Sequence, residues 1–251
     1  MGRPITSPAS APNTPVPAGR RDVHALLHAQ CLATLHDRLS VVPIPPTSST
    51  LALGAGTDIW AADVARRHPE ARARSSPDVR AGLEKCRPRA RLHLVYIRGA
   101  SGHVRDWRAF YRQARQRLRP GGWIEQVECS LHLREATSGA LSRRAVLARW
   151  SQLAVAAATE TGRTLEVAEN MAGLMREAGF ERVAERRFRW PVGGASQLGR
   201  LNRLRWEAGM EEWVGEAYAT ALGWSPQQTR AWLEQVKAAL REERDGVWQE
   251  V

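Results

Sequence analysis

Apolar positions along this chain follow two different periods. Short apolar runs predict strands at residues 51–53, 92–97, 123–133 and 180–190. Apolar residues at helical spacing predict helices over residues 22–37, 58–67, 107–118, 140–161, 165–178, 198–222 and 226–244. Strands that alternate with helices indicate an α/β fold with a mainly parallel central sheet.

The stretch from Glu70 to Arg91 interrupts this alternation. A doubly wound domain needs a strand, a helix and a second strand here, a unit of about thirty residues or more. The stretch is shorter than that and contains no run of β-branched residues. We therefore expect the sheet to lack one or more strands of the usual architecture, with or without the accompanying helix.

The beginning of the chain differs in composition from the rest. Residues 1–19 carry prolines at positions 4, 8, 12, 15 and 17 among Ser, Thr, Ala and Gly, which predicts a disordered tail. A chain of 251 residues can bury one full-sized core. We expect residues 20–251 to form one domain, with helical caps over about 140–161 and 198–244.

Charge and cysteine content exclude several classes of partner. The formal net charge is +11, which would suit a phosphate backbone, but the excess is almost all arginine scattered along the chain. We therefore favour solvated faces over nucleic-acid contact. No apolar run reaches the length of a membrane span, so we expect no membrane contact. Cys31, Cys86 and Cys129 are widely spaced, which predicts reduced thiols and no metal site.

Two glycine-containing segments about sixty residues apart carry the strongest functional signal. In Leu51–Trp60, an apolar strand runs through Gly54-Ala55-Gly56 into a helix, and in Leu118–Val127 a Pro-Gly-Gly turn precedes a new strand. Glycines at such a turn let a ligand approach the backbone at a helix N-terminus. A lone Gly-x-Gly is a weak signal. The two segments together resemble a class I S-adenosylmethionine-dependent methyltransferase.

Further landmarks narrow this resemblance to the LaeA-like, fungal secondary-metabolism group of class I methyltransferases. The matching residues are 22–28, 39–46, 54–61, 98, 102, 106–107, 118–125, 173–180 and 222–225. The resemblance implies a Rossmann-like fold and S-adenosylmethionine as cofactor. It assigns to the cofactor site the residues Gly54, Ala55, Gly56, Thr57, Asp58 and Arg98.

The chain departs from the family pattern where the cofactor is bound. The family's acidic residue two positions before the first glycine is here Ala52, and the third glycine of the loop is Asp58. The ribose-binding acid belongs in the short stretch between Glu70 and Arg91, and the family runs on into a final strand beyond the position of Val251. A missing ribose anchor costs about 1.5–3 kcal/mol if both groups are buried.

These departures leave alternatives open. One is an inactive member that keeps the fold as an interaction module. Another is a gene model that lacks coding sequence around residues 74–91 and after Val251. Transcript sequencing separates this last alternative from the others.

Candidate catalytic chemistry is sparse, because methyl transfer depends mainly on orientation and a dry site. His103 lies in the loop after strand 92–97, at the edge where such folds bind ligands, and it is the candidate base for an acceptor hydroxyl or amine. An exposed loop histidine is the alternative. Glu125 and Glu128 point to opposite faces of their strand, so they form no carboxylate pair. For Glu128, near the strand end, we expect solvent exposure, and contact with an acceptor is the alternative. Trp206 and Trp213 lie two helical turns apart, which suits core packing or an aromatic acceptor pocket.

The sequence thus predicts an S-adenosylmethionine-dependent methyltransferase of secondary metabolism or its regulation. The acceptor is a small-molecule metabolite or a regulatory protein partner. The expected location is the cytoplasm or the nucleus.

Overall fold

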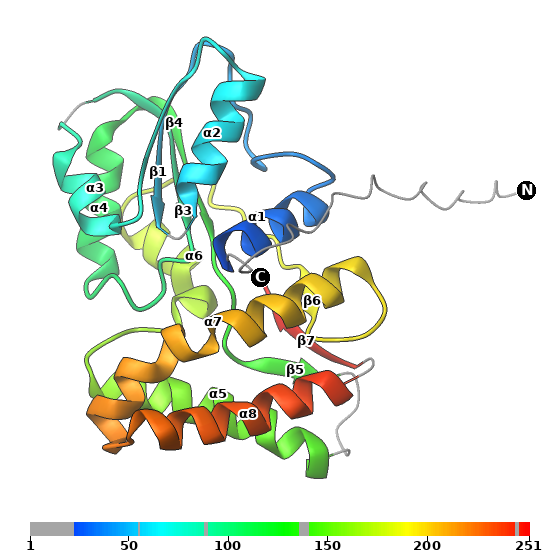
Figure 1. Ribbon diagram of the computed structural model, residues 1–251. Helices are drawn as coiled ribbons and strands as arrows, with labels where there is room; N and C mark the ends of the chain where they lie inside the picture. The colour runs from blue at the N-terminus through cyan, green and yellow to red at the C-terminus, as the bar shows by residue number, and fades with distance from the viewer. Residues whose placement is uncertain (1–22, 55, 88–89, 136–140, 244–245) are drawn as a thin grey trace, which may run out of the picture.

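The computed structural model describes residues 23–54, 56–87, 90–135, 141–243 and 246–251. Figure 1 shows an upper lobe built on a parallel sheet and a lower lobe built mainly of helices. The predicted tail at residues 1–19 and the predicted helix start at Asp22 lie outside the described residues, as does Ala55.

A four-stranded parallel sheet forms the upper lobe. Its strands are β1 (Ser49–Gly54), β2 (Arg72–Ser76), β3 (Leu92–Arg98) and β4 (Leu118–Val127), in the order β2-β1-β3-β4. One face is covered by α1 (Val23–Thr34) and α2 (Thr57–Arg67), and the other by α3 (Val79–Lys85), α4 (Trp107–Arg117) and α6 (Val167–Glu177). Layers on both faces explain why the central strands read as continuous apolar runs. The prediction of an α/β fold with a mainly parallel sheet is confirmed.

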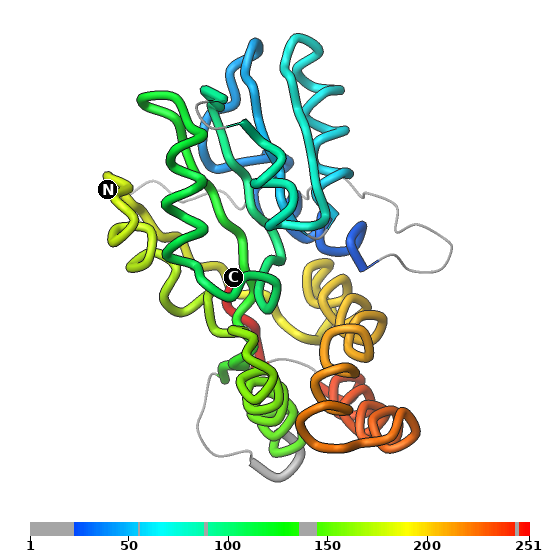
Figure 2. Tube along the Cα trace, turned by 90° about the vertical axis from the view of Figure 1, so that its left-hand side faces the viewer, coloured from blue at the N-terminus to red at the C-terminus, as the bar shows by residue number. Residues whose placement is uncertain are grey.

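The lower lobe is formed by α5 (Leu141–Glu160), α7 (Gln197–Leu222) and α8 (Pro226–Glu242), which pack against one another below the sheet (Figure 2). Trp206 is fully buried there, with its ring centroid 6.1 Å from that of Trp213 and 4.5 Å from that of Trp150. The two tryptophans predicted to be neighbours are therefore neighbours, and they pack in the core.

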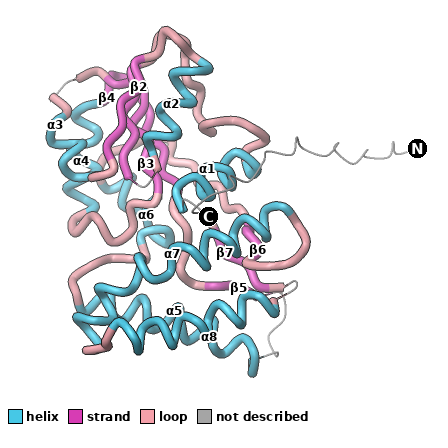
Figure 3. The backbone as a smooth tube through the Cα atoms, viewed as in Figure 1, coloured by secondary structure: helices cyan, strands magenta, loops and turns pink. Residues whose placement is uncertain are grey.

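Three short strands lie between the two lobes (Figure 3). They are β5 (Leu133–Glu135), β6 (Arg189–Pro191) and β7 (Val247–Glu250), paired antiparallel in the order β5-β7-β6. The end of the described chain therefore supplies the middle strand of this small sheet.

The stretch from Glu70 to Arg91 holds one strand, β2, and one helix, α3. The second strand that a doubly wound domain would have here is absent from the described residues of this stretch, as the sequence predicted. The helix of that unit is present. β2 forms without β-branched residues because it is an edge strand whose side chains are mostly exposed. Asp78 accepts a hydrogen bond from the Ala81 N–H at 2.8 Å and so begins α3.

Two strand predictions were wrong in extent. Residues 123–133 are divided between β4, which ends at Val127, and β5, which begins at Leu133. In the segment predicted as a strand from 180 to 190, backbone pairing begins only at Phe188, which exchanges two hydrogen bonds with Val251, and β6 covers Arg189–Pro191. Residues 182–187 lie outside any helix or strand, so a strand-like sequence forms no ladder there.

Candidate functional site

A tight glycine turn stands between the end of β1 and the start of α2. Gly54 and Gly56 have φ angles of 105° and 63°, which favour glycine. A Cβ added to Gly54 would lie 2.2 Å from the carbonyl oxygen of Arg98, so the two strands approach too closely for any side chain. The buried Thr57 hydroxyl donates to the Gly54 carbonyl at 2.9 Å and fixes the turn from within.

Arg98 extends beneath this turn from the end of β3. Its side chain is fully buried, and its guanidinium donates to the Gly56 carbonyl and, at 3.0 Å, to His28 Nδ1. His28 Nε2 lies 3.0 Å from the Asp63 carboxylate. Because Nδ1 accepts from Arg98, the proton of a neutral imidazole is assigned to Nε2, which donates to Asp63. Burial lowers the pKa of His28, although the hydrogen bond with Asp63 raises it.

The chain of contacts joins three elements that are far apart in sequence. His28 comes from α1, Asp63 from α2 and Arg98 from β3. A Cβ on Gly56 would lie 2.6 Å from the Cβ of His24, so α1 also packs directly on the turn. Family resemblance singled out Arg98 and the 22–28 segment that contains His28, but the sequence did not predict that the two side chains meet.

The neighbouring end of β2 carries no acid to hold a ribose. The strand ends in Ser75 and Ser76, and Asp78 is engaged as the cap of α3. Asp58 is exposed in the first turn of α2, whose N-terminus has no side-chain cap. The glycine turn and Arg98 thus fit the amino-acid end of the expected cofactor. The end of β2 offers no carboxylate that could hold its ribose.

Glu128 lies just beyond the end of β4 and is only 2 % exposed, so the prediction of solvent exposure was wrong. Its carboxylate accepts from the Ala100 and Ser101 N–H groups at 2.9 and 3.3 Å and from the Ser101 hydroxyl at 3.0 Å. Burial raises its pKa, and these hydrogen bonds act in the opposite direction. The turn after β3 folds back onto Glu128, a contact across the sheet edge that strand periodicity does not reveal.

His103 is exposed in that same turn. Its backbone N–H donates to the Ala100 carbonyl at 3.0 Å, and the Gly102 N–H donates to the Thr164 carbonyl at 2.9 Å. A second histidine that the sequence reasoning missed, His132, lies near the start of α6, with Nε2 2.7 Å from the Glu166 carboxylate. The turn after β3 and the segment after β4 that carries His132 thus both contact the residues that precede α6.

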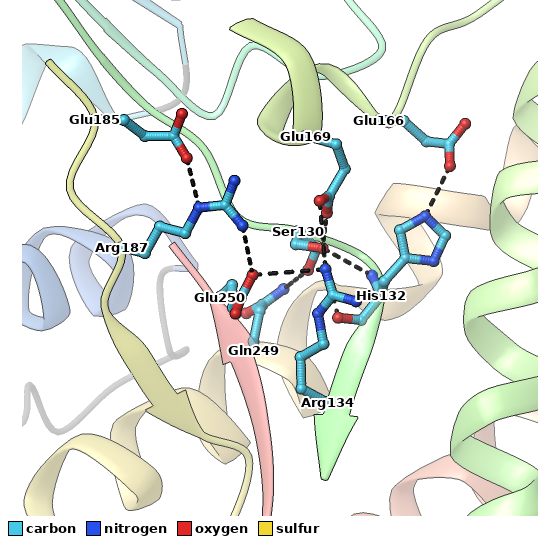
Figure 4. A network of polar contacts seen from close by, with 9 residues as sticks. All are labelled: Ser130, His132, Arg134, Glu166, Glu169, Glu185, Arg187, Gln249 and Glu250. Carbon is cyan, nitrogen blue, oxygen red and sulfur yellow. Dashed lines mark hydrogen bonds and ion pairs between the residues drawn. The ribbon is translucent and has the colours of Figure 1, made fainter. Parts of the chain in front are cut away.

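A polar network continues from there toward the small antiparallel sheet, as Figure 4 shows. The Ser130 hydroxyl donates to Glu169 at 2.5 Å, and Arg134 lies 3.4 Å from Glu169 and 3.6 Å from Glu250. Arg187 contacts Glu250 at 3.5 Å. The network fastens β5, β7 and α6 together below the ends of the parallel strands.

The described ranges lack a cluster of metal ligands and a membrane-spanning helix. No group of three or more His, Cys, Asp or Glu side chains in these ranges is placed to hold a metal ion. The helices in the same ranges are all too short or too polar to cross a membrane. Cys31, Cys86 and Cys129 carry free thiols.

A family model described as a methyltransferase domain matches residues 27–185, which is more than half of the chain. The chain belongs to the S-adenosylmethionine-dependent methyltransferases. The matched range of this methyltransferase contains the glycine turn, Arg98, Glu128 and α6.

Curated relatives of this methyltransferase come from filamentous fungi. Methyltransferase pytC of Aspergillus terreus is 28% identical over 239 residues, which cover 85% of this chain and 74% of the relative. The secondary metabolism regulator laeA of Aspergillus fumigatus is 32% identical over 173 residues, 61% of this chain and 45% of the relative. Among solved structures, a sarcosine dimethylglycine methyltransferase from Galdieria sulphuraria is similar with a TM-score of 0.46 at 14% identity, covering 89% of this chain and 83% of the other.

Proposed function

We propose that this methyltransferase binds the amino-acid end of S-adenosylmethionine at the turn of Gly54 and Gly56, between the N-terminus of α2 and the Arg98 guanidinium. The observation that carries the proposal is the buried Arg98 beneath the turn. A guanidinium suits a carboxylate, and the helix N-terminus favours the same charge. Thr57 holds the turn, whereas Asp58, in the first turn of α2, opposes a carboxylate placed nearby. Ala55 completes the turn in sequence.

The acceptor side of the proposed site is formed by the turn after β3 and the residues after β4. The cofactor supplies an electrophilic methyl group, and this chain's residues must orient the acceptor and remove its proton. His103, exposed in the turn, is the predicted base. His132 is a second candidate, because its Nε2 lies 2.7 Å from the Glu166 carboxylate, which orients the ring. Glu128 positions the turn that carries His103 through its bonds to Ala100 and Ser101.

The fungal relatives support a role in secondary metabolism for this chain. The name of one relative points to an enzyme and that of another to a regulator, so a small-molecule metabolite and a regulatory protein partner both remain candidates for the acceptor. A metabolite acceptor favours the cytoplasm, and a regulatory partner favours the nucleus. The lack of an acid at the end of β2 favours the second candidate function, an inactive module that keeps the fold.

Calorimetric titration of the protein with S-adenosylmethionine and with its demethylated product tests the proposal. We expect micromolar binding. The variant Arg98→Gln should weaken it at least about tenfold, because a hydrogen bond to a charged group contributes about 1.5–3 kcal/mol. Arg80→Gln, the same change in a fully exposed arginine on α3, should leave affinity unchanged. Absence of binding to folded protein at millimolar ligand would favour the inactive module.

A transfer assay then separates the two candidate acceptors. Methyl-labelled cofactor is offered with either the small-molecule or the protein fraction of a fungal extract, and the Arg98→Gln protein serves as the blank. Label in the small-molecule fraction alone supports a metabolite acceptor. Label in a protein band alone supports a regulatory partner.

A further inference from the structure

Positive charge is divided unevenly between the two lobes. Residues 49–127, which build the parallel sheet with α2, α3 and α4, contain 16 Lys and Arg against seven Asp and Glu. They carry a net charge of +9, out of +11 for the whole chain. These arginines look scattered along the sequence, and that pattern favoured solvated faces. The fold brings several of them to one end of the sheet.

That end is where the parallel strands begin, at the top of the upper lobe in Figure 1 and opposite the glycine turn. Arg72 is the first residue of β2, Arg91 immediately precedes β3, and Arg119 is the second residue of β4. All three side chains are exposed. Neighbouring strands lie about 4.8 Å apart, so the row from β2 to β4 extends over about 14 Å.

The ends of α3 and α4 place further cations beside this row. The buried Arg117 donates from Nε to the carbonyls of Leu83 and Cys86, at 2.7 and 3.0 Å, and so joins the end of α4 to the end of α3. Lys85 lies in the last turn of α3, and Arg115 lies in the last turn of α4. We call the exposed cations of this end the basic pole: Arg72, Lys85, Arg87, Arg91, Arg115 and Arg119.

The cations of the basic pole are not neutralised by carboxylates. In the part of the chain that the structure describes, none of the six side chains forms an ion pair, whereas Arg80 and Arg108 on the same two helices do. Glu70, exposed in the turn before β2, pairs with none of the six. Burial, and after it the charge of Arg119, lowers the pKa of His93 on β3. The pole therefore presents a net positive charge to the solvent.

The fold accounts for only part of this charge. The C-terminal end of a helix attracts cations, which explains Lys85 and Arg115. A sheet has only a small net dipole, so the strand starts offer no comparable attraction. The charges of Arg72, Arg91 and Arg119 therefore need a partner from outside the described residues.

We propose that the basic pole binds the phosphate backbone of duplex DNA without reading its bases. Duplex DNA carries one negative charge per about 1.7 Å of its axis, so a row of about 14 Å faces several phosphates. A guanidinium binds a phosphate through two parallel hydrogen bonds. Protein partners usually dock around apolar and aromatic side chains, and Trp123 is the large apolar side chain that the described residues expose. The inference does not depend on the proposed cofactor site, which lies at the other end of the strands.

Fluorescence anisotropy of a labelled DNA duplex, titrated with the full chain at increasing salt, tests the proposal. We expect micromolar binding in about 50 mM NaCl, with equal affinity for two unrelated base sequences. The logarithm of the association constant should fall linearly with the logarithm of the salt concentration. Its slope is about −0.9 for each phosphate neutralised, so use of all six cations gives about −5. No saturable binding at the lowest salt, or a tenfold preference for one sequence, would overturn the proposal.

A triple variant removes the row at the strand starts. The side chains of Arg72, Arg91 and Arg119 form no hydrogen bond or ion pair with other described residues, so changing all three to glutamine should preserve the fold, which circular dichroism checks. Affinity should fall at least about tenfold, and the salt slope should become less steep by about 3. Should this protein fail to fold, Arg87→Gln with Arg115→Gln provides a second test. Unchanged affinity and slope in a folded variant would overturn the proposal.

The matched control changes the net charge by the same amount in the lower lobe. It carries Arg200→Gln on α7 and Arg230→Gln and Arg241→Gln on α8, all at exposed positions. Its affinity for the duplex should fall less than about threefold, since only the long-range field changes. A loss equal to that of the pole variant would show that net charge, and not this surface, attracts DNA, and it would overturn the proposal.

Two other polyanions are titrated at the same ionic strength. Labelled polyglutamate that binds the pole more tightly than the duplex does would identify an acidic protein segment as the partner. Vesicles of anionic phospholipid that bind while the duplex does not would identify a membrane surface. Either result would overturn the proposal, and weaker binding of both than of the duplex supports it.

Discussion

At Gly54 the glycine turn is packed against β3, and a Cβ there would lie 2.2 Å from the Arg98 carbonyl oxygen. On the far side of β3, beside β4, about 410 Å³ is empty and Trp123 is 45% exposed. Both regions belong to the same four-stranded sheet. The inner side of the glycine turn is filled by groups of the chain itself, whereas the cavity beside β4 is left open by the described residues that line it.

The largest expected effect comes from breaking the glycine turn. Gly54→Val forces a β-branched residue to a φ of 105° and drives its Cβ into the backbone of Arg98. Strain and overpacking together should cost about 3 kcal/mol or more of unfolding free energy. Urea unfolding followed by tryptophan fluorescence measures this loss.

Gly173→Ala is the matched control for that change. Gly173 lies within α6 with open space around its Cα. Alanine there should stabilise the protein by about 0.5–1 kcal/mol, because glycine is a poor helix former. Equal stabilities for the valine variant and the wild type would show that the turn is not rigidly packed.

The sequence predicted the central strands of the sheet better than the strand at its edge. The apolar runs of β1 and β3 and the helix start at Asp106, which accepts from the Ala109 N–H at 2.8 Å, are local patterns, and the structure confirms them. β2 was not located, because Arg72–Ser76 is an exposed edge strand held by pairing to β1.

The candidate site shows the same limit. The glycine turn was visible as a motif, but its contact with His28 depends on how α1 packs, 70 residues away in sequence from Arg98. Glu128 was predicted to be exposed because its burial is provided by the distant Ala100–Ser101 turn. Residues 182–187 have a strand-like sequence, and only the structure shows that no strand lies beside them.

An intermediate effect on the free energy of unfolding should distinguish the packed core from the cavity beside β4. Ala154 is fully buried in the lower lobe, and Ala172 lines the cavity of about 410 Å³ beside β4. Ala154→Leu should cost about 1–3 kcal/mol by overpacking, whereas Ala172→Leu should add about 0.5 kcal/mol or more by filling empty space. Both alanines lie within helices, so the backbone preference is similar. Destabilisation of similar size in both variants would mean that the cavity cannot accept a larger side chain any better than the core does.

The smallest effect concerns the proton on His28 and sharpens the description of the turn. Burial lowers the pKa of His28 below its ordinary 6.5, so the folded protein keeps the ring neutral over a range in which the unfolded chain is protonated. The unfolded state then binds more protons, and the free energy of unfolding must fall as the pH drops below about 6.5. The decline continues until the pH reaches the lowered pKa of the folded state.

Urea unfolding at several values between about pH 7.5 and 5.5 measures this slope, in a range where histidine titrates. His28→Gln should be less stable at neutral pH, because it disturbs the contacts with Arg98 and Asp63, but its stability should fall less steeply on acidification. Ala33→Gly, also in α1, costs about 1 kcal/mol and should retain the wild-type slope. A His28→Gln slope equal to that of the wild type would mean that the ring is protonated to the same extent in the folded and unfolded states. In that case the folded structure would not lower the pKa of His28, and burial could not be the main influence on its proton.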